Sequence, residues 1–370
     1  MDELINYLQI DYHKLQKHKD KVQACIAENP LTPITLELQP TERCNCNCPH
    51  CQSKEKYDQN EREYMIRHGI EMDISLIDKV LDYPPDNIII SGTTGDPLLY
   101  SKIDIMLQKI NSKGIPVTII TNGIQLTPYL SKIILDCCYN IRISLDATDD
   151  VSYSKTHGVN LETWTMVTQN ICHLVELKKE RYSDCKIGIG YLTGNKVTRD
   201  LIYAVLQSIK WGVNYIDFRP LQSYRKQAIS SQLLEYLSEL KKQYEDENFY
   251  IWTSHQKYST LTALKRRYNM CLASYLYALI APDGNMYLCC NRVEDKHACY
   301  GNMYNVENWN ELLKSPLKKK IIRNLQSCPN ACRLHTYNTI LSDIISGNNQ
   351  EFFLDLNELT NKKRGVWDAI

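Results

Sequence analysis

Short apolar runs rich in isoleucine and valine recur along the first 220 residues, and polar stretches with apolar residues at helical spacing separate them. The runs are predicted strands at 34–39, 87–91, 116–121, 140–145, 186–192 and 214–219. The stretches between them are predicted helices at 74–83, 101–113, 127–137, 160–180 and 199–211. Because strands that alternate with helices form parallel sheets with right-handed crossovers, the pattern predicts an α/β fold. Six units favour a partial (β/α)6 TIM-like barrel, and a doubly wound sheet is the competing architecture.

The two ends of the chain lack this repeat and are predicted to be separate units. Past residue 226 the sequence predicts a helix near 228–246, a strand at 248–253, a hairpin turn at 281–285, and helices at 307–325 and 335–346. The predicted units are an N-terminal helical extension (1–33), the barrel (34–226), a linker helix and strand (227–255), an α+β domain (256–348) and a C-terminal tail (349–370).

Composition narrows the class of protein. Of the 370 residues, 43% are hydrophobic and 23% are charged, which excludes disordered and fibrous classes. The 43 basic residues balance the 43 acidic ones, so no electrostatic footprint points to nucleic acid or an anionic membrane, and we expect neither as a partner. The basic run Lys318-Lys319-Lys320 is predicted to be a solvated helix face. No apolar stretch reaches the ~18 residues that a membrane-spanning helix needs.

The cysteine count points to metal or redox chemistry. The start of the chain, Met1-Asp2-Glu3, lacks the features of a secretory signal, so we expect a cytoplasmic, reducing location. A framework of disulfides is not favoured there, and the count of 15 cysteines is odd.

Three of these cysteines follow the first predicted strand as Cys44-x3-Cys48-x2-Cys51. Three thiolates from one loop can hold three corners of a 4Fe–4S cube and leave one iron open. A closed zinc site would need four ligands, and zinc or inert thiols are the alternatives. The carboxyl end of a barrel strand is also where such folds place their active sites. Cys46 falls outside the spacing and is expected to be a free loop thiol.

This loop resembles the signature of the radical S-adenosylmethionine (SAM) superfamily, with His50 at the position where the family usually has an aromatic residue. After the second strand, Thr94-Gly95-Asp96-Pro97 is similar to the family's Gly-Gly-Glu-Pro element, which holds the amino group of SAM. Thr94 replaces the first glycine and Asp96 replaces the glutamate, so the carboxylate is one methylene shorter. The resemblance implies a SAM-binding cluster on the cysteine loop, with Gly95 and Asp96 beside it.

The resemblance extends in order along residues 34–220 and implies further SAM contacts. These are Asn122 after strand three, Ser144 and Asp146 at the end of strand four, and Leu192 in strand five. Where many relatives carry an arginine for the carboxylate of SAM, this chain has Lys155 and His157, and only lysine keeps a permanent charge at pH 7. Arg219, at the end of strand six, is a candidate for an anionic group of the substrate or of SAM, and a structural salt bridge is its alternative.

A second group of cysteines resembles the SPASM/twitch extension of these enzymes. Its opening is Cys271-x12-Gly284-x4-Cys289-Cys290, and its close is Cys328-x3-Cys332. A full SPASM domain closes with four cysteines, so the resemblance implies the shorter twitch form with one auxiliary 4Fe–4S cluster. The implied ligands are Cys271, Cys289, Cys328 and Cys332. Sets that use Cys290 or Cys299, and a zinc ion held by the same four residues, stay open.

The resemblance implies an oxidoreductase that cleaves SAM reductively to a 5′-deoxyadenosyl radical, which abstracts a hydrogen atom from its substrate. The auxiliary cluster would assist oxidation or electron transfer, and the electron donor would be of the flavodoxin or ferredoxin type. A small-molecule, sugar-like substrate is favoured, because residues 1–33 are too short and too poor in strands for a leader-binding domain. The alternatives are a maturase that modifies a ribosomal peptide, and a non-catalytic iron–sulfur or zinc protein. The sequence identifies no catalytic acid or base.

Overall fold

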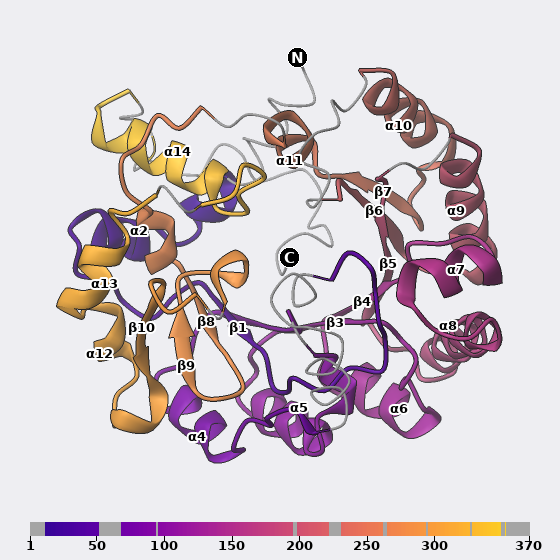
Figure 1. Cartoon of the computed structure of the whole chain (residues 1–370), viewed down its shortest axis with the longest axis horizontal. Coiled ribbons are helices and arrows are strands. Elements are labelled where there is room, and N and C mark those ends of the chain that lie inside the picture. The colour runs from indigo at the N-terminus through magenta and orange to yellow at the C-terminus, as the bar shows by residue number, and fades with distance from the viewer. Residues whose placement is uncertain are drawn as a thin grey trace.

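A curved ten-stranded sheet forms the centre of the computed structural model (Figure 1). The model describes residues 12–51, 68–93, 95–194, 198–221, 231–261, 265–293, 295–325, 328–348 and 352. The strands are β1 (Thr35–Leu38), β2 (Asn87–Ile90), β3 (Val117–Thr121), β4 (Asn140–Ser144), β5 (Lys186–Leu192), β6 (Tyr215–Arg219), β7 (Tyr250–Thr253), β8 (Tyr277–Ile280), β9 (Asn285–Tyr287) and β10 (Cys299–Asn302). Their order across the sheet is β10-β9-β8-β1-β2-β3-β4-β5-β6-β7.

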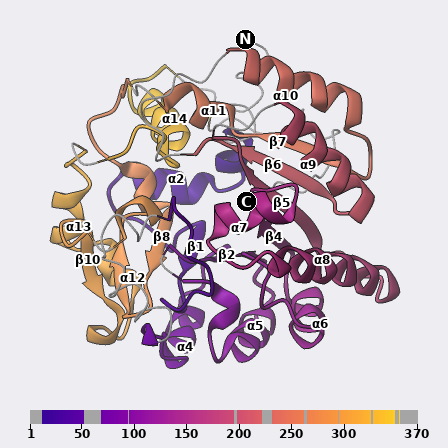
Figure 2. The same cartoon turned by 45° about the vertical axis from the view of Figure 1, so that its right-hand side comes forward.

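The helices lie around the outside of this curved sheet (Figures 1 and 2). They are α2 (Lys19–Ile26), α4 (Ser75–Asp82), α5 (Ile103–Asn111), α6 (Pro128–Cys137), α7 (Asp150–His157), α8 (Glu162–Glu180), α9 (Thr198–Trp211), α10 (Ser231–Tyr244), α11 (His255–Thr260), α12 (Asn310–Leu313), α13 (Pro316–Ile321) and α14 (His335–Ile345). Alternate strand positions such as Leu36, Ile141 and Ile189 are buried in the apolar core that the helices cover. The intervening positions include Glu37 and Arg142, so the two faces of the sheet differ in polarity.

The predicted α/β partial barrel is confirmed. All six predicted strands are present, and the strand expected at 248–253 is β7, which pairs in parallel with β6. Strands β1 to β7 follow one another in sequence order across the sheet, whereas a doubly wound sheet reverses its strand order part-way.

The C-terminal strands join the same sheet. Strand β8 pairs in parallel with β1, with Thr35 opposite Tyr277 and Leu38 opposite Ile280, and β9 and β10 continue from it as antiparallel strands. The turn expected at 281–285 connects β8 to β9, with Gly284 at a φ of 79°. The division into domains stays a prediction, since backbone hydrogen bonds run without a break from barrel to C-terminal segment.

Three local predictions differ from the structure. The helix expected over 307–325 is two helices, α12 and α13, because Ser315 caps a new helix that begins at Pro316. Helix α7 was not predicted. The solvated face expected for the lysine run is wrong for Lys318, which is fully buried, donates from Nζ to the Ser274 carbonyl (2.9 Å) and lies 4.2 Å from the Tyr300 ring centroid.

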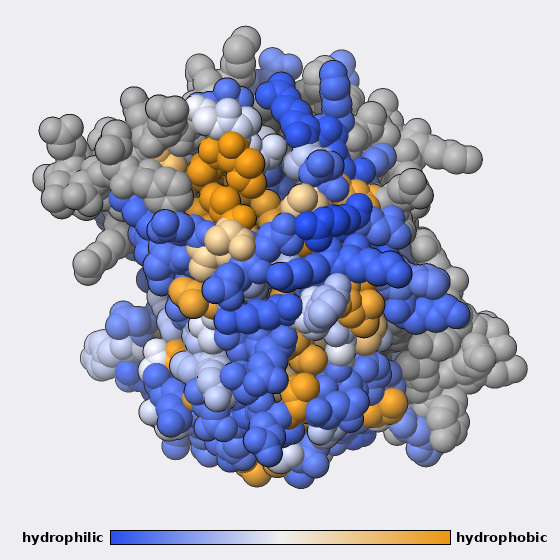
Figure 3. All heavy atoms as spheres, turned by 90° about the vertical axis from the view of Figure 1, so that its left-hand side faces the viewer, coloured by the Kyte–Doolittle hydropathy of each residue, from blue (hydrophilic) through white to orange (hydrophobic). Residues whose placement is uncertain are grey.

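One whole face of the molecule is mostly hydrophilic, with a patch of apolar side chains in its upper part (Figure 3). Within the described residues, no helix combines the length and the apolar character that a membrane crossing requires. Residues 1–11, and all of the predicted tail except Phe352, lie outside the described residues.

Candidate active site and auxiliary cysteine site

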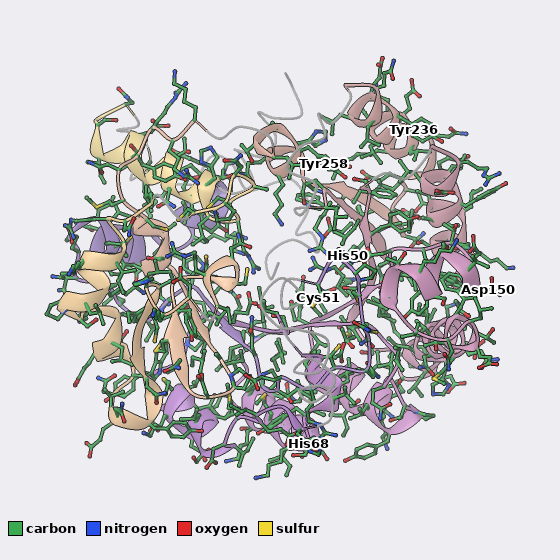
Figure 4. The ribbon with its side chains drawn as sticks, in the orientation of Figure 1. His50, Cys51, His68, Asp150, Tyr236 and Tyr258 are labelled. Atoms are coloured by element: carbon green, nitrogen blue, oxygen red, sulfur yellow. The ribbon has the colours of Figure 1, made fainter. Side chains whose placement is uncertain are left out.

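The loop that leaves β1 carries the first three predicted ligands, Cys44, Cys48 and Cys51. All three are partly exposed. Figure 4 shows Cys51 and the neighbouring His50 near the middle of the ring of elements. The Sγ atom of Cys51 lies 3.9 Å from the carbonyl oxygen of Thr93, in the segment that follows β2. The loop therefore presents its thiols at the carboxyl edge of the parallel strands, as predicted from sequence.

Cys46, expected from its spacing to be a free loop thiol, forms no disulfide. It is buried, and its backbone N–H donates to the Sγ atom of Cys44 (3.4 Å). Hydrogen bonds with the Cys44 and Cys48 thiols, together with burial, hold the pKa of Cys46 far above its ordinary value. The Cys46 thiol thus lies beside two predicted ligands and stays protonated in this environment.

Close backbone approaches fix the loop. The N–H of Asn47 donates to the His157 carbonyl (2.8 Å) at the end of α7. Gly158 follows with a φ of 64°, and a Cβ atom there would lie 2.2 Å from the Asn47 carbonyl oxygen. A Cβ atom on Gly95 would similarly lie 2.0 Å from the carbonyl oxygen of Thr41. Both positions need glycine, because any side chain would push the cysteine loop away.

Asp96 binds the loops of β2 and β3 together. Its Oδ1 accepts from the N–H of Leu98 (3.0 Å), and its Oδ2 accepts from the N–H of Asn122 (2.7 Å). The hydroxyl of Thr121 lies 2.9 Å from both oxygens. Burial raises the pKa of this carboxyl, and the three donors oppose that shift. Both oxygens are engaged within the fold, and the predicted contact with SAM stays a prediction. Thr94 lies outside the described residues.

The other predicted SAM contacts gather at the same strand edge. The side-chain N–H of Asn122 donates to Oδ1 of Asn45 on the cysteine loop (2.7 Å). Asp146, with a φ of 52°, accepts the N–H of Leu192 at its Oδ1 (2.6 Å). The carbonyl of Ser144 lies 3.2 Å from Nε2 of His157. These contacts join the ends of β3, β4 and β5 to the loop that carries the cysteines.

Lys155 and His157, the two candidates for the carboxylate of SAM, differ in environment. Lys155 is exposed on α7. His157 is buried, stacks on Tyr153 with ring centroids 4.2 Å apart, and has its pKa lowered by burial. His157 is therefore neutral at pH 7 and supports the Ser144 backbone, so the anion-binding role of either residue stays a prediction.

The C-terminal cysteines come together as a mainly buried group. Burial raises the pKa of Cys289, and the thiols of Cys290, Cys332 and Cys271 raise it further. The thiols of Cys271 and Cys328 act in the same way on Cys332. The four predicted ligands are thus electrostatic neighbours of one another, although their ligand roles remain predicted.

The two competing cysteines differ in their relation to that group: the Cys290 thiol acts on Cys289, whereas Cys299 lies apart. The Sγ atom of Cys299 lies 3.6 Å from the Gly301 carbonyl, and the charge that raises its pKa, after burial, is Asp283 rather than a thiol. Cys290 accepts from Nη1 of Arg333 (3.6 Å), on the side of the sheet interior. This arrangement favours the predicted set over one that includes Cys299.

Cationic and amide donors surround the predicted auxiliary ligands. Nη1 of Arg292 donates to the Cys328 sulfur (3.8 Å), and Nδ2 of Asn338 donates to the Cys271 sulfur (3.4 Å). Hydrogen bonds to sulfur and nearby positive charge stabilise reduced iron–sulfur clusters and tune their potential. Among the described residues, no three histidine, cysteine or carboxylate side chains converge on a point that would hold one metal ion. An iron–sulfur cube instead binds each cysteine on a separate iron.

Sequence reasoning missed a group of charged side chains on the inner strand positions. Arg219 was predicted, and it lies beside Asp217 and Arg142, with Lys257 and Arg333 nearby. The signal was present as charged residues at alternate positions of β4 and β6.

The sequence model of the radical SAM superfamily matches residues 38–202, which include the cysteine loop and strands β2 to β5. The chain carries a radical SAM domain. A protein described as "Probable GTP 3′,8-cyclase" from Methanococcus maripaludis is 30% identical over 131 residues, which are 35% of this chain and 42% of that protein. The GTP 3′,8-cyclase of Staphylococcus aureus is 29% identical over 138 residues, or 36% and 40% of the two chains. The chain thus spans well under half the length of these curated relatives.

Solved structures resemble the fold over a larger part of this chain. Streptococcus suis SuiB bound to S-adenosylmethionine aligns with a TM-score of 0.61 and 17% identity, covering 88% of this chain and 76% of SuiB. The structure named anSMEcpe with bound AdoMet and Cp18Cys peptide aligns with a TM-score of 0.55 and 14% identity, covering 86% and 97%. At these identities the likeness shows the shared fold.

Proposed function

We propose that this protein is a radical SAM enzyme in which Cys44, Cys48 and Cys51 hold the cluster that binds SAM. The observation that carries the proposal is the position of these partly exposed thiols on one loop at the carboxyl edge of the sheet. Three ligands leave one iron of a cube free for SAM, so the donor set fits the cofactor. When bound, cluster and SAM supply a 5′-deoxyadenosyl radical that abstracts a hydrogen atom from the substrate.

The side chains around the loop would orient SAM and exclude water from it. Asn122 donates to Asn45 on the cysteine loop, and Leu192 donates to Asp146, so hydrogen bonds join these strand ends and support a rigid rim. A rigid rim holds reacting groups at a fixed distance, and a closed one keeps water away from a reactive intermediate. Asp96, His50, Gly95, Ser144 and Lys155 complete the proposed SAM-binding residues, and Arg219 would bind an anionic group of SAM or of the substrate.

We further propose that Cys271, Cys289, Cys328 and Cys332 hold one auxiliary 4Fe–4S cluster. The burial of Cys271, Cys289 and Cys332 and the Arg292 side chain beside Cys328 support this, because a largely buried site with a cationic neighbour suits an electron acceptor. The enzyme would then be an oxidoreductase that draws its first electron from a flavodoxin- or ferredoxin-type donor. Such clusters need a reducing location, which agrees with the cytoplasm expected from sequence.

For the substrate we propose a small molecule. The charged inner positions of β4 and β6 support this, because they offer specific contacts to a polar compound. Modification of a ribosomal peptide is the alternative, since SuiB has been solved bound to its precursor peptide SuiA and aligns with 85% of this chain. That likeness, at 18% identity, concerns the fold.

Anaerobic reconstitution tests the proposal. The protein should bind about eight iron and eight sulfide per chain, as two four-iron clusters require, and release 5′-deoxyadenosine when reduced with SAM. Cys44→Ala should abolish this release and remove about half of the iron. Cys172→Ala, at a partly exposed cysteine on α8, is the matched control and should change neither quantity. Absence of cleavage by the reconstituted wild type, with unchanged iron in Cys44→Ala, would overturn the proposal.

A further inference from the structure

The inner positions of strands β4 and β6 are charged where barrels usually pack apolar side chains. Small α/β barrels fill their interior with branched hydrophobic residues. In this chain Arg142 projects from β4, and Asp217 and Arg219 project from β6, at alternating positions that share one face. A charged interior is costly to form, so it calls for a ligand or a complete set of internal partners.

Two arginines share one carboxylate oxygen on this face. Nη1 of Arg142 lies 2.9 Å from Oδ2 of Asp217, and Nε of Arg219 lies 3.2 Å from the same oxygen. Gly190, on the strand between them, makes the space: a Cβ atom there would lie 3.2 Å from Nη2 of Arg219. Within the described residues, Oδ1 of Asp217 and Nε of Arg142 are buried and have no hydrogen-bond partner. The group is therefore incompletely satisfied by the protein itself.

A third cation approaches from the other side of the sheet interior. Nη1 of Arg333 lies 2.6 Å from Oε2 of Glu37, which also accepts a hydrogen bond from the Tyr277 hydroxyl. Arg333 packs over the Tyr277 ring, with 5.0 Å between the guanidinium carbon and the ring centroid. Its side chain remains 28% exposed, so it has one face against protein and one face open.

Lys257, on α11, is the fourth cation. No hydrogen bond or ion pair to its ammonium group occurs in the part of the chain that the structure describes. Burial is the main cause that lowers its pKa to about 7, and the positive charges of Arg219 and Arg333 contribute to this lowering. The hydroxyl of Tyr258, the next residue, lies 3.0 Å from that of Thr193 after β5 and fixes α11 against the barrel. Figure 4 shows Tyr258 on α11 at the edge of the central region.

We propose that this cationic wall, made of Arg142, Arg219, Lys257 and Arg333, binds a dianionic group of the substrate. The three arginines face two carboxylates, Asp217 and Glu37, so the wall has an excess of one positive charge, which rises to two when Lys257 is protonated. Guanidinium groups bind phosphate and carboxylate oxygens through paired N–H donors, and a nearby lysine adds a point charge. A phosphate ester and a dicarboxylate share this chemistry. SAM has one carboxylate, which would leave one of these two charges unmatched.

Binding of simple dianions to the full-length protein tests the cationic wall. Inorganic phosphate and succinate are titrated separately by calorimetry at low ionic strength, with chloride as the reference anion. We expect at least one of the two to bind the wild type, and Lys257→Met and Arg219→Gln to weaken that binding tenfold or more. Lys210→Met, at an exposed lysine on α9, is the matched control and should bind as the wild type does. Which anion binds more tightly separates phosphate from dicarboxylate substrates.

Lys257→Met keeps the test decisive even where Arg219→Gln does not fold, since Lys257 holds no partner in the described structure. If neither anion binds the wild type, or if Lys257→Met binds both as well as Lys210→Met does, the inference is wrong. It deepens the proposed function and rests on it, but the two fail separately. Release of 5′-deoxyadenosine by a wild type that binds neither anion refutes the cationic wall alone, whereas anion binding without SAM cleavage refutes the proposed activity alone.

Discussion

The two cysteine groups of this protein differ most in their exposure. Cys44, Cys48 and Cys51 are partly exposed on a loop, whereas Cys271, Cys289 and Cys332 are buried in the C-terminal segment. An accessible group with three ligands leaves a coordination position that a small molecule can enter and leave. A buried group with four ligands has no such position, and its metal contributes to folding instead. Under the proposed function, the exposed group is the site where SAM binds and leaves, and the buried group is a permanent part of the core.

The largest expected effect is on stability, and it should come from the buried group. We expect Cys271→Ala/Cys289→Ala to lose about half of the iron and to lower the free energy of unfolding by several kcal/mol, on the order of a structural metal's contribution. In the wild type, burial raises the pKa of both thiols, so both are protonated when no metal is bound. Iron analysis and thermal unfolding under anaerobic conditions measure the two quantities.

Cys48→Ala/Cys51→Ala is the matched variant for the exposed group. It should also lose about half of the iron, yet unfold at nearly the wild-type temperature, because its thiols lie on a loop rather than in the core. Equal destabilisation by the two double variants would contradict the contrast between the groups. Zinc in the purified wild type, or full retention of iron in the C-terminal variant, would refute the auxiliary cluster.

The C-terminal end of α7 contacts the loop that carries Cys44, Cys48 and Cys51, and a substitution at Gly158 tests this support. Gly158→Ala should destabilise the protein by about 2–4 kcal/mol, because it adds a clash with the Asn47 carbonyl to the strain of a left-handed backbone. Gly114→Ala is the matched control: its φ is 67°, but a Cβ atom there meets nothing within 4 Å, so it should cost about 1 kcal/mol. Chemical denaturation measures both, and the iron content should fall only in Gly158→Ala. Equal effects in the two variants would show that α7 does not support the cysteine loop.

A smaller effect is expected at Asp96. Asp96→Asn places an amide N–H where the carboxylate accepts the N–H of Asn122 or the N–H of Leu98, so one buried donor loses its acceptor. The expected loss of stability is about 1–3 kcal/mol. Asp150→Asn, at an exposed carboxylate on α7, should change stability by less (Figure 4). If Asp96→Asn unfolds as the wild type does while SAM binding weakens, the carboxylate serves SAM rather than the fold.

The last expected effect is the pH dependence that Lys257 introduces. Burial, with Arg219 and Arg333, lowers its pKa to about 7 in the folded protein, whereas an unfolded lysine has a pKa of about 10.4. Between these values the unfolded chain binds more protons, so the contribution of Lys257 to stability rises with pH. Arg142 adds to the shift and Asp217 opposes it.

The comparison with Lys257→Met isolates this contribution. The variant should be more stable than the wild type at pH 7, and the difference should shrink as the pH approaches 10. Urea unfolding at the two pH values measures it. A difference that stays constant over this range would mean that Lys257 keeps its ordinary pKa.

Periodicity and spacing predicted the elements that local sequence determines. Strands β1 to β6 follow their isoleucine and valine runs, and the cysteine loop lies where it was expected. Helix α7 was missed because its sequence has no apolar period. Its caps were visible nonetheless, since Asp149 forms a capping box with Ser152 and Gly158 ends the helix in a left-handed conformation.

The remaining differences depend on contacts between distant parts of the chain. Nothing local in β1 indicates that β8 pairs with it, because strand pairing across the C-terminal segment is set by tertiary packing. Lys318 lies in a run of three lysines, yet the Tyr300 ring and the Ser274 carbonyl enclose it. The cationic wall likewise combines residues of β4, β6, α11 and the segment after Cys332, which meet only in the folded protein.

Because β1 pairs with β8, this part of the sheet can form only late in the synthesis of the chain. Glu37 on β1 and Tyr277 on β8, which are joined by a side-chain hydrogen bond, are 240 residues apart in the sequence. Ribosomes add about 5–20 residues per second. One edge of β1 therefore stays without its neighbour for roughly 10–50 s after β1 is made. Open strand edges promote association with other chains. The loop with Cys44, Cys48 and Cys51 follows directly after this strand. The nascent protein therefore exposes three thiols beside an unpaired strand edge until β8 has been synthesised.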